Sequence, residues 1–439
     1  MQRKLIDAMK RWKDSANRKP LILLGARQVG KTWLMQEFGR RFYDSVAYVN
    51  CDAEPLAKRL FTDDYDINRI LFSIQTITGV KPLPGSTLII FDELQEAPRG
   101  LHSLKYFLEN APQYHVVAAG SLLGVTLGTG ESFPVGKVDM MRVCPMDFEE
   151  FLEANDAGNL AEVLRRGDWS MIDMFSTKFR EQLLQYYFVG GMPEVVAHFV
   201  ADHDQREVRR YQENILEAYR NDVSKHSSKS ESIRIGQVME SLPSQLAKEN
   251  KKFIYGAMRP GARAREYEVA IQWLIDAGIA VKVPRVNEQR MPLKFYEDAA
   301  SFKLFLLDCG LLGCMAGASP KQMLADDSVF IEFKGAFTEQ FVLQQLVAGG
   351  QRPYYWSSAA TPAEIDFVVE TADRVIPIEV KAGENVRSRS MKTYIDSHPA
   401  DHLKGLRISM RGYVDQGWME NIPLYGILHC RELFGSGDD

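Results

Sequence analysis

The first third of the chain alternates short apolar runs with longer stretches of helical periodicity. Continuous apolar runs of this kind are typical of strands that are buried on both faces of a parallel sheet. The strand-like runs are Leu21–Leu24, Val46–Asn50, Leu88–Phe91 and His115–Ala119, and the helix-like stretches between them are Lys31–Phe42, Pro55–Phe61 and Leu101–Asn110. We therefore expect residues 1–152 to form an α/β domain with a parallel sheet covered by helices.

The middle of the chain is predominantly helical. Residues 153–234 have charged faces, and the run from Gly190 to Pro193 predicts that one helix ends and another begins there. Residues 235–290 predict three helices, with Pro243 opening the second and Arg263–Ala277 forming the third, followed by an alternating strand from Ile279. This order resembles a winged helix, preceded by a helical lid or linker.

Strands and helices are mixed in residues 291–439. The predicted strands are Phe302–Leu307, Glu364–Val369, Val375–Val380, Leu406–Ser409 and Leu424–Leu428, and a helix is predicted at Phe337–Val347. This part is expected to be a second α/β domain.

Composition narrows the class of protein. A chain of 439 residues should hold about three domains, and 45% hydrophobic with 25% charged residues excludes wholesale disorder. The net charge of -5 excludes a globally basic surface. Five scattered cysteines fit a reducing cytosol. The longest apolar stretch, Phe305–Ala318, is shorter than the ~20 residues that span a bilayer, so we expect a cytoplasmic protein without a membrane partner.

A phosphate-binding loop follows the first strand. The run from Gly25 to Thr32 matches G-x-x-x-x-G-K-[ST] between a strand and a helix. Lys31 would neutralise phosphate oxygens, and the Thr32 hydroxyl would bind Mg²⁺. ATP is expected because no N-K-x-D motif for guanine is present. The candidate nucleotide-binding residues in this loop are Gly25, Arg27, Gln28, Val29, Gly30, Lys31 and Thr32.

Further acids and polar groups follow the later strands. Asp92 is a candidate Mg²⁺-binding carboxylate and Glu93 a candidate general base, although two acids could simply open a surface loop. Ser121 could contact the γ-phosphate or cap a helix. Arg142 could be an arginine finger or an ordinary exposed arginine.

A second constellation lies near the C-terminus. An apolar strand presents Asp366, and Glu379 and Lys381 lie on one face of the next strand. With Glu339 from the preceding helix, the acids could bind Mg²⁺ or Mn²⁺, and Lys381 could position a water. A hairpin with a solvated charged face is the alternative.

Several motifs together resemble a known family. They are GARQVGKT, FDELQ, the run Phe188–Glu194, the run Leu306–Leu312, and EIDFVV with IEVKAG. The set resembles bacterial and archaeal AAA-type ATPases fused to a C-terminal domain of unknown function with a restriction-endonuclease-like core. The resemblance implies an AAA+-like fold followed by a winged helix. It also implies a PD-(D/E)xK pattern at Glu339, Asp366, Glu379 and Lys381.

These observations predict a protein that binds and hydrolyses ATP with Mg²⁺ and controls a nuclease-fold domain acting on nucleic acid. Clustered cations in the winged-helix region suggest DNA contacts, and winged helices also contact proteins; they are Lys248, Lys251, Lys252, Arg259, Arg263 and Arg265. The alternatives are a nucleotide-dependent switch whose C-terminal domain binds DNA or a protein without cleavage, and an assembly ATPase. A homo-oligomer is compatible with each of them.

Overall fold

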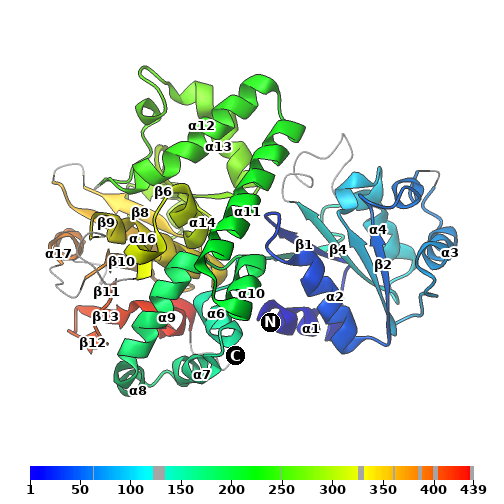
Figure 1. Ribbon diagram of the computed structural model, residues 1–439, viewed down its shortest axis with the longest axis horizontal. Coiled ribbons are helices and arrows are strands. Elements are labelled where there is room, and N and C mark those ends of the chain that lie inside the picture. The colour runs from blue at the N-terminus through cyan, green and yellow to red at the C-terminus, as the bar shows by residue number, and fades with distance from the viewer. Residues whose placement is uncertain are drawn as a thin grey trace. The chain divides into compact units, whose positions relative to one another are not determined.

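The computed structural model describes residues 1–62, 64–121, 134–248, 250–324, 331–358, 361–383, 388–398 and 404–435. The chain folds into two compact units, which we call the N-terminal unit (Gln2–Cys144) and the C-terminal unit (most of Pro145–Asp439) (Figure 1). Among the described residues, every helix is either too short or too polar to cross a lipid bilayer.

The N-terminal unit contains the predicted parallel sheet. Its strands are β1 (Leu21–Gly25), β2 (Ser45–Asn50), β3 (Thr87–Asp92), β4 (His115–Ser121) and β5 (Asp139–Arg142), in the order β2-β3-β4-β1-β5. All neighbouring strands run parallel. The edge strand β5 was not predicted. Its residues are alternately half-buried and exposed, so this short strand lacks the continuous apolar run of a fully buried strand. Since the strands are parallel, the carboxyl ends of β1, β3 and β4 share one edge of the sheet.

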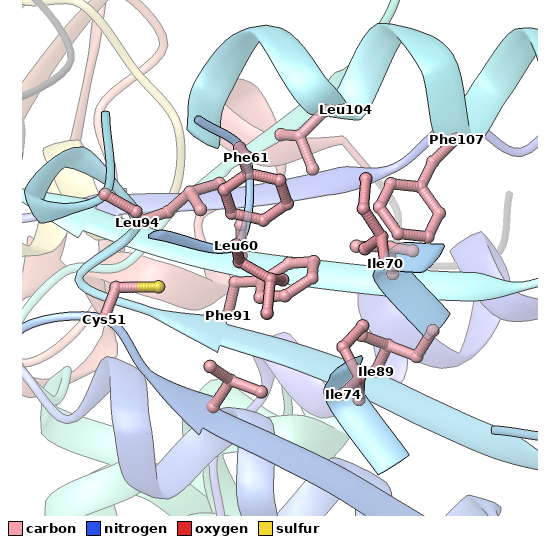
Figure 2. Packing of buried hydrophobic residues seen from close by; sticks show 14 of the residues in the cluster. Cys51, Leu60, Phe61, Ile70, Ile74, Ile89, Phe91, Leu94, Leu104 and Phe107 are labelled. Atoms are coloured by element: carbon pink, nitrogen blue, oxygen red, sulfur yellow. The ribbon is translucent and has the colours of Figure 1, made fainter. Parts of the chain in front are cut away.

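Helices cover both faces of this sheet. They are α1 (Leu5–Asp14), α2 (Lys31–Phe42), α3 (Ile67–Thr78) and α4 (Gly100–Asn110), with short 3-10 turns η1 (Ala57–Arg59) and η2 (Leu94–Glu96). The helix predicted over residues 55–61 is wrong except for the η1 turn, and α3 was missed. Figure 2 shows the core on one face, where side chains of η1, α3 and α4 pack against β3.

Strand alternation sorts the side chains of β3 between the two faces. Ile89 and Phe91 belong to the core in Figure 2, so Leu88, Ile90 and Asp92 must point to the opposite face. A Cβ atom on Gly39 of α2 would lie 3.3 Å from Leu88 Cδ2, which places α2 on that opposite face. Asp92 therefore points to the side of the sheet where α2 begins.

The C-terminal unit opens with a run of helices. The helices of this unit are α6 (Phe148–Ala154), α7 (Gly158–Arg166), α8 (Trp169–Met174), α9 (Ser176–Val189), α10 (Pro193–Asp202), α11 (Gln205–His226), α12 (Lys229–Leu246), α13 (Ala264–Asp276), α14 (Cys309–Met315), α15 (Pro320–Leu324), α16 (Ile331–Ala348), α17 (Arg389–Asp396) and α18 (Arg431–Phe434). The break predicted between Gly190 and Pro193 is confirmed. The helix start predicted at Pro243 is wrong, because α12 continues through this proline to Leu246.

A mixed sheet of eight strands forms the rest of this unit. Its strands are β6 (Ala280–Val286), β7 (Glu297–Leu306), β8 (Tyr354–Ser357), β9 (Glu364–Glu370), β10 (Val375–Lys381), β11 (Gly405–Ser409), β12 (Val414–Asp415) and β13 (Met419–Pro423), in the order β12-β13-β11-β10-β9-β8-β6-β7. Residues 424–428 belong to a 3-10 helix, η7 (Leu424–His429), so the strand predicted there is wrong. A five-residue apolar run does not distinguish a strand from a buried helical turn.

The structure divides the chain differently from the sequence prediction. The predicted boundary at residue 290 falls between β6 and β7, which pair with each other antiparallel. Strand β6 also pairs with β8 and so joins the eight-stranded sheet. Where three helices were predicted for a winged helix, the structure has α12 and α13 before the β6–β7 hairpin, and these elements belong to the same compact unit as the C-terminal strands.

Two of the glycine motifs pack against each other within this unit. Asp308 caps α14 and accepts a hydrogen bond of 2.6 Å from the backbone N–H of Gly191. A Cβ atom on Gly191 would lie 2.1 Å from the carbonyl oxygen of Met146, and one on Gly310 would lie 2.4 Å from that of Val189. Only glycine allows backbones to approach this closely, so these motifs have a packing role.

Candidate functional site

The loop between β1 and α2 has the backbone of an anion-binding turn. Gly30, the N-cap of α2, has φ 90°, and Gln28 has φ 65°. Non-glycine residues rarely adopt positive φ, and such strain is concentrated at ligand sites. Val29 is buried while Arg27 is half-buried. A left-handed turn at the N-terminus of a helix suits a phosphate, because the helix end carries partial positive charge and unpaired N–H groups.

Lys31 folds back over this loop. Its ammonium donates hydrogen bonds to the carbonyl oxygens of Gly25 (2.9 Å) and Ala26 (2.8 Å), and the side chain is buried. A Cβ atom on Gly25 would lie 2.4 Å from the carbonyl oxygen of Val143, so a glycine is needed where the loop begins. The lysine charge is thus held at the turn where the loop N–H groups lie.

The hydroxyl of Thr32 is joined to Asp92. Thr32 Oγ1 donates a 2.6 Å hydrogen bond to Asp92 Oδ2, and Tyr48 donates a second hydrogen bond of 2.9 Å to the same oxygen. Burial, together with the negative charge of Asp92, raises the pKa of Tyr48 far above its ordinary value. The phenol therefore stays protonated and remains a donor to the carboxylate.

Glu93 leaves the strand in an unusual conformation. It has φ 50° directly after β3, and its backbone N–H donates to Asp92 Oδ1 at 3.2 Å. Gln95 Nε2 donates a 2.5 Å hydrogen bond to Glu93 Oε2. This contact holds one carboxylate oxygen and leaves the other as an acceptor, which is the arrangement that a general base requires.

The other predicted residues lie near the loop along the sheet. The backbone of Ser121, at the end of β4, pairs in register with Gly25; its side chain lies outside the described residues. Arg142 is exposed at the end of β5, in register with Leu24. The structure thus brings the backbone of Ser121 to the start of the loop, while the roles of both side chains stay predictions.

Three residues of this site were missed by the sequence analysis. Arg3 is buried and donates hydrogen bonds to the carbonyl oxygens of Val29 (3.2 Å) and Cys144 (2.7 Å). Tyr48 and Gln95 contact the two acids. Of these, only Gln95 carried a signal, since it lies in the FDELQ motif; the contacts of Arg3 and Tyr48 depend on tertiary structure.

These residues fit ATP and Mg²⁺. The Thr32 hydroxyl and the Asp92 carboxylate offer the hard oxygen atoms that Mg²⁺ prefers, and they are already adjacent. The lysine, the left-handed Gly30 and the N-terminus of α2 supply the complementary positive potential for phosphates. The residues at this edge of the sheet therefore match the chemistry that a nucleotide and its metal ion would need.

A second cluster of charged residues lies in the C-terminal unit. Four acids, which we call the acid cluster, come from α16 (Glu339), β9 (Glu364 and Asp366) and β10 (Glu379). Ile378 pairs with Phe367, so Glu379 comes next to Asp366 along the two strands. Asp366 Oδ2 accepts a 2.8 Å hydrogen bond from the N–H of Val380. The predicted acids are thus brought together, and Glu364 was missed.

Lysines neutralise these acids. Lys381 lies 2.9 Å from Glu379 Oε1, and Lys251 lies 2.5 Å from Glu339 Oε1. The fully buried Lys303 of β7 lies 2.5 Å from Glu364 Oε1 in an ion pair that is not aligned as a hydrogen bond. Lys303 was not predicted, because it belongs to a strand with no motif of its own.

The pKa values reflect this crowding. Burial, and then the charge of Glu339, raise the pKa of Asp366 to about 7, while Lys303 opposes the rise. Burial acts to lower the pKa of Lys303, but the surrounding carboxylates outweigh burial and raise the pKa. The ammonium of Lys303 therefore stays charged.

The acid cluster does not fit a divalent metal as it stands. Among the described residues, no group of three or more His, Cys, Asp and Glu side chains is placed to hold an ion. Two positive unit charges 4 Å apart repel each other by about 4 kcal/mol at an effective dielectric constant of 20, and a divalent ion by about twice that. The charge of Lys303 thus opposes the metal predicted at Glu339, Asp366 and Glu379.

Part of the predicted basic surface is also engaged in ion pairs. Lys251 is buried against Glu339, and Arg259 lies 2.8 Å from Glu266. Four other cations of this surface are exposed, namely Lys248, Lys252, Arg263 and Arg265. The basic patch expected to contact DNA is therefore smaller than the sequence suggested.

Three family models match separate segments of the chain. Residues 17–152 match a model described as an AAA domain. Residues 180–322 match a domain of unknown function, DUF8612, and residues 334–428 match another, DUF4143. The match over residues 17–152 supports the AAA-type domain that the sequence predicted for the N-terminal unit. Among curated proteins, none matches the chain.

The solved structures that match the chain do so with low sequence identity and low TM-scores. A Walker-type ATPase of Pyrococcus abyssi is 15% identical, with 72% of this chain and 95% of that chain covered and a TM-score of 0.43. The ORC1 protein of Aeropyrum pernix in complex with DNA is 13% identical, with 72% and 91% covered and a TM-score of 0.26. Cdc6p of Pyrobaculum aerophilum is 11% identical, with 73% and 92% covered and a TM-score of 0.25. Likenesses at these TM-scores carry no argument about function.

Proposed function

We propose that the N-terminal unit binds and hydrolyses ATP with Mg²⁺. The observation that carries the proposal is the 2.6 Å hydrogen bond between Thr32 and Asp92, which joins the end of the phosphate-loop motif to the end of the acidic strand. A chance glycine-rich turn would not need a buried carboxylate beside its threonine. The bound Mg²⁺ would supply charge neutralisation at the phosphates.

Each side chain has a distinct part in this reaction. The Thr32 hydroxyl and the Asp92 carboxylate would hold the ion, and Lys31 would exchange its loop carbonyls for phosphate oxygens. Glu93 takes a proton from the attacking water, and Gln95 keeps its carboxylate in one orientation. Arg3 stabilises the loop through its hydrogen bond to the Val29 carbonyl oxygen.

For the C-terminal unit, we propose binding of DNA or a protein without cleavage, in preference to metal-dependent cleavage of nucleic acid. Two features support this order: Lys381 pairs with Glu379, and the charge of Lys303 lies beside Glu339 and Asp366. Both engage groups that a nuclease would use. The nucleotide would then act as a switch that changes the affinity of this unit for DNA or a protein, because a ligand shifts an equilibrium only through differential binding to two states.

Nucleotide binding tests the first part of the proposal. Lys31→Ala should weaken binding of a fluorescent ATP analogue by at least about tenfold, since a lysine–phosphate contact is worth well over 1.4 kcal/mol. The matched control is Lys10→Ala, which removes an exposed lysine of α1 that pairs with Asp14. Equal affinities for the two variants would reject the site.

DNA cleavage tests the second part. We expect no cleavage of single-stranded, duplex or branched DNA by the wild type in Mg²⁺ or Mn²⁺, with or without ATP. Cleavage by the wild type that is lost in Lys381→Ala would restore the nuclease interpretation. Binding of DNA only in the ATP state would identify the switch partner as nucleic acid, and ATP-dependent capture of a purified protein without DNA binding would identify it as a protein.

A further inference from the structure

Lys303 carries a positive charge in the interior of the C-terminal unit. Its side chain is 0% exposed. A lysine is rarely buried to this degree unless opposite charges surround it. Its ammonium lies 5.0 Å from the centroid of the Tyr355 ring on β8, within the range of a cation–π contact. The ammonium therefore lies within reach of both the Tyr355 ring and the acid cluster.

Three carboxylates of the acid cluster converge on this ammonium. The nitrogen lies 2.5 Å from Glu364 Oε1, 3.9 Å from Glu339 Oε2 and 4.0 Å from Asp366 Oδ1. These acids come from α16 and β9, whereas the lysine comes from β7. A single ammonium thus neutralises carboxylates from separate elements and reduces their mutual repulsion. A divalent ion has the same effect in an acidic metal site.

Two carboxylate oxygens of the acid cluster accept no hydrogen bond from the described residues. They are Glu339 Oε2 and Glu379 Oε2, and both are buried. The other oxygens of these two acids are paired with Lys251 and Lys381. With Asp366, the two oxygens would become the ligands of a cation if the charge of Lys303 were removed.

We propose that Lys303 is a built-in cation in the place of a divalent metal, and that the acid cluster becomes a metal site when this ammonium is removed. The inference concerns the C-terminal unit alone, so it holds whether or not the N-terminal unit hydrolyses ATP. It follows that this unit needs no divalent ion to hold its four acids together.

Binding of Mn²⁺ to the full chain without nucleotide, followed by electron paramagnetic resonance, tests the proposal. Lys303→Met should bind one more Mn²⁺ per chain than the wild type, at least tenfold more tightly than any wild-type binding at this cluster. Adding Asp366→Asn to that variant should remove the gain. The matched control is Lys282→Met, which removes a lysine of β6 that lies over the Phe302 ring, 4.7 Å from its centroid, and it should behave as the wild type.

Two results would overturn the inference. One is Mn²⁺ binding by the wild type that Asp366→Asn weakens, because the cluster would then already be a metal site. The other is a folded Lys303→Met variant that gains no ion. If that variant folds only when Mn²⁺ is added, the proposal is supported. If it does not fold at all, the comparison of the wild type with Asp366→Asn decides: equal Mn²⁺ binding supports the built-in cation.

Discussion

Thr32 Oγ1, in the first turn of α2, donates a 2.6 Å hydrogen bond to Asp92 Oδ2 at the end of β3. Strand β4 lies between β1 and β3, so the contact spans two strand spacings of the sheet. Thr32 and Asp92 can still meet, because α2 packs on the face of the sheet to which Asp92 points. The phosphate loop and the acidic strand thereby form one site.

Replacing Thr32 should show whether its hydroxyl holds the ion. Thr32→Val keeps the shape of the side chain but removes the oxygen, so Mg²⁺-dependent ATP affinity should fall by about tenfold or more. Thr32→Ser keeps the oxygen and should remain near the wild type. The measurement is ATP titration in Mg²⁺ and in EDTA; a valine variant that keeps the full effect of Mg²⁺ would contradict the assignment.

Replacing Glu93 should separate binding from hydrolysis. Glu93→Gln retains the side-chain shape but cannot accept a proton from water, so the hydrolysis rate should fall by about 10²-fold with ATP affinity unchanged. Phosphate release under single-turnover conditions measures the rate. The control is Glu96→Gln, which changes a half-buried glutamate at the end of η2, four residues after the end of β3. Hydrolysis that survives in Glu93→Gln would mean that another group is the base.

The stability of the N-terminal unit should fall in mild acid because of His115. Burial, followed by the charges of Arg18 and Lys13, lowers the pKa of His115 to about 4. Its neutral ring shares a 2.7 Å hydrogen bond with the Tyr43 hydroxyl. The unfolded chain, with an ordinary histidine pKa, binds the proton first, so stability is lost as the pH falls from about 6.5 towards 4.

The expected size of this effect is about 2 kcal/mol between pH 8 and pH 5. Urea unfolding of the wild type and of His115→Gln at both pH values measures it. The glutamine variant lacks the titrating ring, so its stability should depend less on pH in this range. Equal pH dependence of the two proteins would show that His115 does not titrate as described.

The packing role of the glycine motif predicts a large difference between two glycine substitutions. Gly191→Ala places a Cβ atom 2.1 Å from the Met146 carbonyl oxygen, so it should destabilise the C-terminal unit by about 3 kcal/mol or more. Gly236→Ala lies in the interior of α12 with no atom within 4 Å and should be neutral or stabilise by up to about 1 kcal/mol. Chemical denaturation measures both, and similar stabilities would refute the close backbone approach.

Local patterns predicted the nucleotide site and misjudged some elements. The phosphate loop is contiguous, and its chemistry depends on the order of strand, loop and helix, so the residues from Gly25 to Thr32 could be predicted without the tertiary structure. Pro243 and the run at residues 424–428 were misjudged for the opposite reason. Whether a proline ends a helix, or an apolar run becomes a strand, depends on the packing around it.

Residues that are close along the chain were enough to predict the parallel sheet, the phosphate loop, Asp92 with Glu93, and the acids and lysine of the second constellation. The surroundings of these groups depend on segments that meet only in the folded chain. Lys251 reaches Glu339 across 88 residues, and Lys303 meets its acids from another strand of the sheet. Electrostatic interactions act through space and burial strengthens them, so the charge balance of the acid cluster emerges only when the chain is folded.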